Sequence, residues 1–124
     1  ISMKDDTDTI LRKFRRAVTD SEACVRYAEG KDGINNLMEI YSAVTGRTLE
    51  QIETDFAGKG YGDFKTAVGE AVAEELRPIQ QRFNDYMKDK AQLEAWMQKG
   101  AENAARVSAR TLNKAKKRMG FVLL

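Results

Sequence analysis

The stretch Gly58-Lys59-Gly60-Tyr61-Gly62-Asp63-Phe64-Lys65 decides how we read the fold, because it joins a glycine turn to the strongest helical pattern in the chain. Glycine adopts positive φ without strain, so the alternating glycines predict a tight turn. Asp63 is expected to cap the helix that follows by accepting an amide hydrogen bond. Apolar residues then recur at helical spacing: Phe64, Val68, Ala71, Val72, Leu76, Ile79, Phe83 and Met87. This stripe predicts a central helix of about seven turns on which the other helices pack, with a kink caused by Pro78.

Three shorter helices are predicted before the glycine turn. The first spans roughly 8–18, with a cap at position 6 or 7, and the second spans roughly 34–44. The third opens at Thr48-Leu49-Glu50-Gln51, which has the capping-box pattern of a threonine followed three residues later by glutamine. We expect Val18 to lie on the buried face of the first helix. In the irregular link that follows it, we expect Cys24 to be a small buried hydrophobic residue.

A long helix is predicted at the C-terminal end, from about Lys90 to Arg118, with Asp89 as its cap. Leu93, Trp96 and Met97 form a bulky apolar group in its first turns, so we expect Trp96 to be a core residue rather than a base-stacking platform. Small residues are expected to face inward farther along: Ala101, Ala104, Ala105, Ser108 and Ala115. The apolar tail 121–124 is expected to fold back on the bundle. The predicted fold class is therefore all-α, a single domain over 1–124 with about five helices, of which the central and the C-terminal ones are long.

Composition excludes several classes of function. The chain has 124 residues, no histidine and one cysteine, so it offers no zinc ligand set, no serine–histidine pair and no catalytic residues that we can nominate. The Asp6-Thr7-Asp8 sequence lacks the glycine of a calcium loop. No apolar run is long enough to span a membrane, and the single cysteine fits a reducing cytoplasm. Because the chain begins at Ile1, we expect a fragment or a processed product.

Charge is distributed unevenly along the sequence. All 19 acidic residues lie at or before Glu102, whereas six of the 21 basic residues follow it. Five cations lie at steps of three, four or seven residues on one side of the predicted last helix: Lys99, Arg106, Arg110, Lys114 and Lys117. We predict that they contact phosphates of a nucleic acid. Basic residues also complement the dipole at a helix C-terminus, which is an alternative reason for the last of them.

The glycine stretch does not match a nucleotide-binding loop. Its spacing fits neither the dinucleotide fingerprint nor the P-loop, in which Gly-Lys is followed by serine or threonine. A helix-to-helix turn explains it better, although Lys59 and Tyr61 stay open as exposed ligands for a phosphate or a base.

Several motifs, taken in order, resemble the C-terminal region of bacterial tryptophanyl-tRNA synthetases, and the likeness covers essentially the whole chain. These motifs are Asp5-Asp6 with Thr9-Ile10, Arg16-Ala17-Val18-Thr19-Asp20-Ser21, Gly33-Ile34-Asn35-Asn36-Leu37 with Ile40-Tyr41-Ser42, Thr45-Gly46, the glycine stretch 58–65, Leu76-Arg77-Pro78-Ile79-Gln80 and Gly100-Ala101. The segments around Thr19-Asp20-Ser21 and the glycine stretch are the most specific.

The resemblance implies a function for the chain. The family is class I, with a Rossmann domain that uses ATP and Mg²⁺ to attach tryptophan to its tRNA, and that domain precedes the region seen here. The chain would then be the helical, anticodon-binding part, inactive alone and without ATP, Mg²⁺ or tryptophan ligands. Its partners would be tryptophan tRNA and the catalytic domain, to which the first helix and Thr19-Asp20-Ser21 would be adjacent. The parent would be a homodimer and this part a monomer. The rival hypothesis is a stand-alone helical protein-interaction module whose basic end binds an acidic protein.

Overall fold

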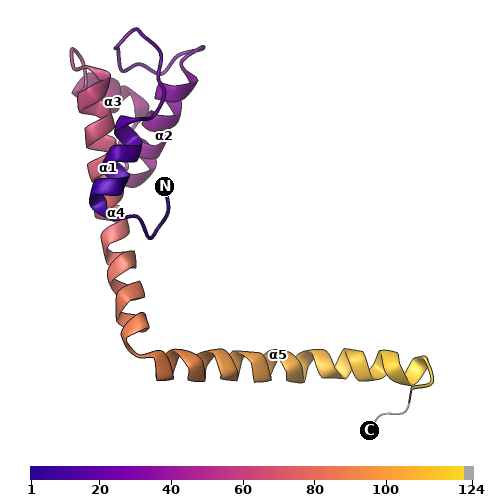
Figure 1. Cartoon of the computed structure of the whole chain (residues 1–124). Coiled ribbons are helices and arrows are strands. Elements are labelled where there is room, and N and C mark those ends of the chain that lie inside the picture. The colour runs from indigo at the N-terminus through magenta and orange to yellow at the C-terminus, as the bar shows by residue number, and fades with distance from the viewer. Residues whose placement is uncertain (122–124) are drawn as a thin grey trace. The chain divides into compact units, whose positions relative to one another are not determined.

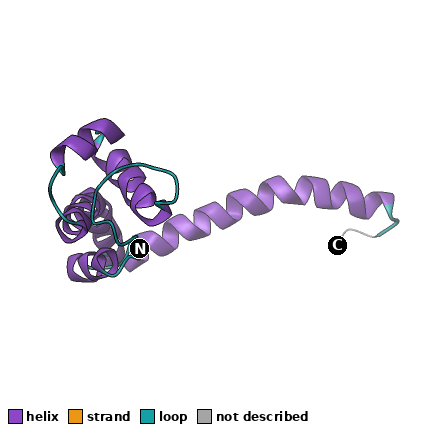
Figure 2. Cartoon of the chain, turned by 90° about the horizontal axis from the view of Figure 1, so that it is seen from above, coloured by secondary structure: helices purple, strands orange, loops and turns teal. Residues whose placement is uncertain are grey.

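The computed structural model describes residues 1–121. Of the tail 121–124 that was predicted to fold back, Phe121 is 62% exposed, and 122–124 lie outside the described residues. The described part contains five helices and no strand (Figures 1 and 2), which confirms the all-α prediction with its long fourth and fifth helices. The helices are α1 (Thr7–Arg15), α2 (Asp32–Thr45), α3 (Leu49–Asp55), α4 (Tyr61–Lys88) and α5 (Lys90–Arg118). Contacts divide the chain into two compact units, Ile1–Arg82 and the residues from Phe83 onward. Each unit is described by itself.

Helix α1 is shorter than predicted. Asp6 caps it, with Oδ1 accepting the Thr9 amide at 2.7 Å. The Ala17 amide bonds to the Phe14 carbonyl at 3.0 Å, which tightens the last turn, and the Ala17 carbonyl accepts a bond from Lys65 Nζ at 2.8 Å. The chain therefore leaves the helix before Val18. Val18 is 87% exposed, so the prediction that it is buried is wrong.

Helices α2 and α3 begin and end near the predicted residues. Gly46 ends α2 with φ of 71°, a conformation that glycine adopts without strain. The Thr48 side chain accepts the Gln51 amide at 3.3 Å, and the Gln51 side chain accepts the Thr48 amide at 3.0 Å. Both bonds of the capping box predicted for α3 are therefore present.

Helix α4 begins two residues before Asp63, so the prediction that Asp63 is its N-cap is wrong. The Gly60 carbonyl accepts the Phe64 amide at 3.3 Å, so the helical bonding has already begun there. Within the glycine stretch only Gly58 has positive φ, 75°, because one such residue suffices to turn the chain from α3 into α4. Pro78 lies inside α4, and the kink there stays a prediction.

The core of the first unit lies between α1, α2, α3 and the first turns of α4. Its largest fully buried side chains are Phe64, Ile10, Ile34, Met38, Ile52 and Val68. Tyr41, Phe56 and Phe64 pack edge to face, with ring centroids 4.8 to 5.8 Å apart. This cluster fixes α3 against α2 and α4.

Two predictions about burial fail at the margins of this core. Val25 of the link is 5% exposed and fills the core position, whereas Cys24 is exposed. Adjacent side chains of a non-helical link point in different directions, so only one of the two enters the core. The apolar stripe of α4 is buried only in its first half: Ile79 is 39% exposed, and Phe83 and Met87 are each 42% exposed.

Candidate nucleic-acid interface

Helix α5 places the five predicted cations on one side. Asp89 caps the helix, as predicted, with Oδ1 accepting the Gln92 amide at 2.9 Å. At about 100° per residue, Lys99, Arg106, Arg110, Lys114 and Lys117 fall within about 80° of arc. All five are exposed. We call these five residues the basic stripe.

The basic stripe carries cations that no carboxylate of the described residues neutralises. None of the ion pairs within residues 1–121 involves one of the five, and no acidic residue follows Glu102 in the sequence. Lys117 lies in the last turn of α5, where it also complements the helix dipole. The other four lie at or before Lys114, so they present positive charge along about four turns of exposed helix.

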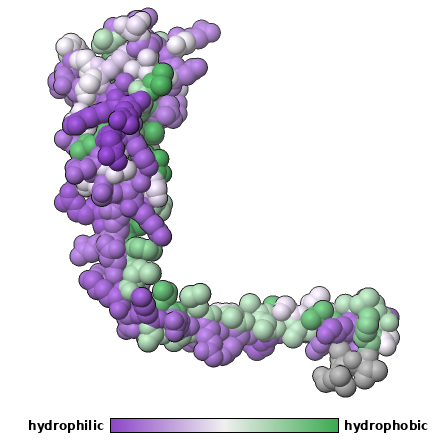
Figure 3. Space-filling view, viewed as in Figure 1, coloured by the Kyte–Doolittle hydropathy of each residue, from purple (hydrophilic) through white to green (hydrophobic). Residues whose placement is uncertain are grey.

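The opposite side of α5 is apolar and exposed. None of its described residues is buried, so the prediction that its small residues and bulky first turns face inward is wrong for this structure. We define the apolar face as the apolar residues that lie about 140–220° from Lys99, namely Met97, Ala101, Ala104, Leu112, Ala115 and the C-cap Met119. Lys90, Glu94 and Ser108 lie on the same arc and interrupt it. Figure 3 shows hydrophilic and hydrophobic surfaces running beside each other along this helix. Helix propensity and the caps contribute to the stability of α5, since none of its described residues is buried.

Trp96 is not the core residue that the sequence predicted. Its side chain is 51% exposed and meets the ring of Tyr86 edge to face, at 5.6 Å between centroids and 81° between planes. Both residues belong to the second unit. Trp96 lies about 60° from Lys99 around α5, at the edge of the basic stripe.

A polar cluster around the buried Lys31 and Tyr61 in the first unit was missed by sequence reasoning. Lys31, 4% exposed, donates from Nζ to Asp20 Oδ1 at 3.2 Å, to the Tyr61 hydroxyl at 3.1 Å and to Glu22 Oε2 at 2.7 Å. The Tyr61 hydroxyl donates to the Asp20 carboxylate, at 2.7 and 2.8 Å from its two oxygens. This cluster ties the link after α1 to the starts of α2 and α4. Residues 20, 31 and 61 are far apart in sequence, so no local pattern reveals it.

The cluster shifts the protonation equilibria of its members. The pKa of Asp20 is lowered to about 2, chiefly by the hydrogen bond from Tyr61 and also by the Glu22 amide and Lys31, against a desolvation effect that raises it. The contact with Glu22 is the main reason that the pKa of Lys31 is raised. Burial raises the pKa of Tyr61. Lys31 is therefore a charged structural residue rather than a nucleophile, and Tyr61, 8% exposed, is not the exposed ligand that the sequence left open.

Two kinds of feature are absent from the described residues. No helix within residues 1–121 is long and apolar enough to cross a membrane. The same residues contain no group of three or more Asp, Glu or Cys side chains arranged to hold a metal ion. The fold and the exposed cations therefore define an all-α module whose chemistry suits binding a polyanion.

Comparison with known proteins gives this module a family. The model of tRNA synthetases class I (W and Y) matches residues 1–77. The tryptophan–tRNA ligase of Clostridium tetani is 43% identical over 99% of this chain and 36% of its own length. That of Bacillus anthracis is 46% identical over 98% of this chain and 37% of its own. The crystal structure of tryptophanyl-tRNA synthetase from Mycoplasma pneumoniae superposes with a TM-score of 0.74 at 26% identity, over 98% of this chain and 38% of that one.

The chain belongs to the class I tRNA synthetases of the tryptophan and tyrosine type. It spans little more than a third of the length of the tryptophan–tRNA ligases that it matches, 36% and 37% in the two above.

Proposed function

We propose that this chain is the tRNA-binding helical domain of a tryptophan–tRNA ligase and that it engages the anticodon part of tryptophan tRNA. The relatives that match it over nearly its whole length are named as such ligases, which supports the choice of partner. The observation that carries the binding role is the basic stripe of α5: five exposed cations without a carboxylate partner among the described residues. Phosphate contacts supply affinity in this proposal, and a few base contacts supply specificity.

Attachment of tryptophan, with ATP and Mg²⁺, is assigned in this proposal to the part of the ligase that this chain does not span. The described residues offer no metal-holding group, and we derive no chemical step through them. The chain's own role is to bind and position. The catalytic domain is its proposed intramolecular partner, within a dimeric parent protein.

The test reverses two charges of the stripe and compares them with a matched pair. Arg106→Glu with Arg110→Glu changes the net charge from +2 to −2, and so does Lys116→Glu with Arg118→Glu. The control pair lies on α5 about 100° to either side of Lys99, outside the stripe. Binding of labelled tryptophan tRNA is measured by fluorescence anisotropy at several salt concentrations. Circular dichroism verifies that each variant is folded.

We expect the stripe variant to bind at least about tenfold more weakly than the control, since charge-assisted contacts are lost. The wild-type slope of log K against log salt should be roughly −3 for four contacts, and the stripe variant should lose about 1.4–1.8 of it. Weaker binding to a tRNA with an altered anticodon would support anticodon recognition. Equal weakening by both variants, or none by either, contradicts the role of the stripe.

The rival function, a protein-interaction module, is favoured by one observation, the exposed apolar face of α5. It predicts no salt-dependent binding of tryptophan tRNA in the same assay. Salt-dependent tRNA binding that only the stripe variant weakens would exclude it as the sole function.

A further inference from the structure

One side chain of α4 holds the segment that leads into α1. Gln80 donates from Nε2 to the carbonyl oxygen of Met3 at 2.9 Å and to that of Asp5 at 2.8 Å. These partners are 77 and 75 positions away in the sequence, yet all three residues belong to the first unit. A primary amide carries two N–H groups, so one glutamine can satisfy both carbonyls at once. The function proposed above gives Gln80 no role.

The segment that Gln80 holds has a defined shape. We call residues 2–5 the lead-in turn. The Asp5 amide donates to the Ser2 carbonyl at 3.1 Å, and the Asp5 carboxylate accepts the Ser2 amide at 2.8 Å and Lys13 Nζ at 2.6 Å. The residue that follows the turn is the cap of α1. Local bonds therefore fix the lead-in turn relative to α1, and Gln80 fixes it relative to α4.

Apolar burial contributes little to this attachment. Ile1 and Met3 are 57% and 64% exposed. On α4 the last buried residue is Ala73, and Gln80 follows it by about two turns. Hydrogen bonds depend on angle as well as on distance, so two of them from one amide define an orientation and not only a proximity. Gln80 therefore orients the lead-in turn on α4.

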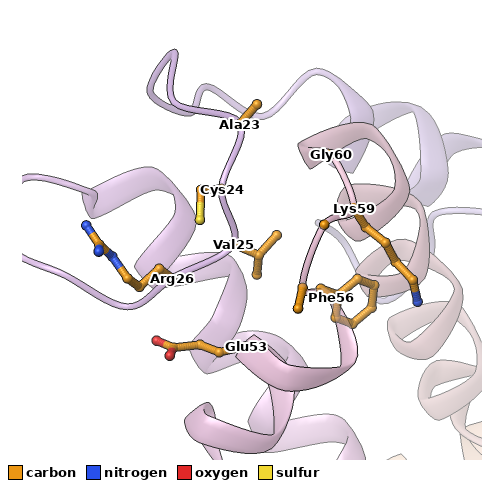
Figure 4. A pocket seen from close by; sticks show the side chains of 10 residues that line it. Ala23, Cys24, Val25, Arg26, Glu53, Phe56, Lys59 and Gly60 are labelled. Carbon is orange, nitrogen blue, oxygen red and sulfur yellow. The ribbon is translucent and has the colours of Figure 1, made fainter.

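The start of α4 is fixed elsewhere in the same unit. The turn before the helix, residues 56–60, lies beside residues 23–26 of the link, and the two segments line a pocket of about 530 Å³ (Figure 4). Tyr61 begins the helix and donates to the Asp20 carboxylate at 2.7 Å. Gln80 lies about 28 Å farther along the helix, at about 1.5 Å per residue. Helix α4 therefore connects the pocket side of the unit with the lead-in turn.

We propose that Gln80 is a positioning residue: by orienting the lead-in turn on α4, it sets the orientation of the catalytic domain relative to the tRNA-binding domain. The inference rests on the proposed function, in which the catalytic domain is joined to the start of this chain. Transfer of an amino acid to tRNA requires the bound tRNA and the active site to meet in one geometry. A misplacement of about 1 Å, caused far from the reacting atoms, can lower such a rate about 100-fold.

Three variants isolate the two hydrogen bonds. Gln80→Glu keeps the shape of the side chain and removes both donors at neutral pH, since an ionised carboxylate only accepts hydrogen bonds. Gln81→Glu is the matched control, because it places the same charge on the adjacent, exposed residue of α4. Gln80→Lys supplies N–H donors again and tests for rescue. Circular dichroism verifies that each variant is folded.

The first measurement is made on this chain. Relaxation of the backbone amides of Lys4 and Asp5 gives order parameters for the lead-in turn. We expect values of about 0.85, as in rigid backbone, in the wild type and in Gln81→Glu. In Gln80→Glu they should fall below about 0.6, the range of flexible backbone, and Gln80→Lys should restore most of the difference.

The second measurement uses the full-length ligase with the same variants. In Gln80→Glu we expect kcat for attachment of tryptophan to tRNA to fall at least about tenfold, with KM for tRNA within about twofold. Activation of tryptophan by ATP, measured by pyrophosphate exchange without tRNA, should stay within about twofold. A merely structural defect would reduce the amount of folded enzyme and so lower both rates together. Gln80→Lys should recover most of the lost kcat.

Each outcome decides the inference. Lost order of the lead-in turn together with the split between the two rates supports it. Unchanged order in Gln80→Glu would overturn the attachment, and lost order with an unchanged kcat would overturn the positioning role. Because the basic stripe is tested by tRNA affinity, either result leaves the proposed function standing. A full-length protein that attaches no tryptophan to tRNA would overturn the proposed function and the positioning role together, whereas the order parameters would still decide the attachment.

Discussion

Tyr61→Phe tests whether the polar cluster around Lys31 and Tyr61 holds the first unit together. The substitution removes one oxygen atom and keeps the ring, which is 8% exposed and part of the core. The hydroxyl donates to the Asp20 carboxylate at 2.7 Å and accepts from Lys31 Nζ at 3.1 Å.

The expected loss follows from these contacts. A hydrogen bond to a charged group contributes about 1.5–3 kcal/mol to stability. Asp20 keeps the Glu22 amide at 2.9 Å and Lys31 at 3.2 Å, and Lys31 keeps Glu22 at 2.7 Å, so neither charge is left without a partner. We therefore expect Tyr61→Phe to lower the free energy of unfolding by about 2 kcal/mol, out of a typical total of about 5–15 kcal/mol.

The assay is urea unfolding at pH 7, followed by circular dichroism. Tyr41→Phe is the matched control, since Tyr41 also packs against the core rings but its hydroxyl makes no hydrogen bond within the described residues. It should stay within about 0.5 kcal/mol of the wild type. A Tyr61→Phe variant equally close to the wild type would refute the reasoning.

The loss of stability caused by Tyr61→Phe should also depend on pH, in a direction that follows from the charge of Asp20. The pKa of Asp20 is lowered from 3.8 to about 2, and the hydrogen bond from Tyr61 is the largest of the causes, ahead of the bonds from the Glu22 amide and Lys31. A carboxyl whose pKa is lowered on folding contributes stability above its ordinary pKa, and that contribution disappears as the pH falls through the folded value. The difference between Tyr61→Phe and the wild type should therefore be full at pH 7 and shrink between about pH 4 and pH 2. A constant difference over that range would mean that the ionised Asp20 is not its source.

Two further predictions concern local geometry. Gly33→Ala should destabilise the first unit by about 1–3 kcal/mol in urea unfolding, because the new Cβ would lie 2.3 Å from the Val18 carbonyl oxygen. Gly62→Ala is the control: its Cβ would meet nothing within 4 Å, so it should be neutral or stabilise the unit by up to about 1 kcal/mol. Equal effects of the two variants would contradict the close approach at Gly33. Thr48→Ala should lower the free energy of unfolding by about 1 kcal/mol, because it removes the hydrogen bond from the Gln51 amide. Thr48→Ser keeps a hydroxyl and should retain most of that stability. An alanine variant as stable as the wild type would show that the capping box adds nothing measurable.

The sequence predicted features whose cause is local. Asp6, Thr48 and Asp89 cap their helices because each accepts an amide only three residues ahead. The last helix runs from Lys90 to Arg118, as predicted, with Asp89 as its cap. The basic stripe follows from spacing alone, although its contact with RNA stays a prediction.

The sequence misled where a residue's pattern fitted a role that the surrounding structure did not give it. Trp96 and Met97 occur at the spacing of a core, yet they are 51% and 67% exposed, because periodicity predicts a common face and not what covers it. Asp63 has the chemistry of a cap, yet the glycine turn lets α4 begin at Tyr61, before it. Cys24 and Val25 are both small and apolar, and only packing distinguishes the exposed residue from the buried one.

The sequence by itself determined the helices of this protein, the caps of α1, α3 and α5 and the charged side of α5, because hydrogen bonds and side-chain neighbours three or four residues apart follow from the order of residues. Only the tertiary structure decided that Lys31 is a buried cation shared by Asp20, Glu22 and Tyr61, and that residues 23–26 and 56–60 enclose one pocket. Those arrangements join residues about 10 to 40 positions apart. They exist because burial of the core brings α2, α3 and α4 together, and a buried charge must then find its partners.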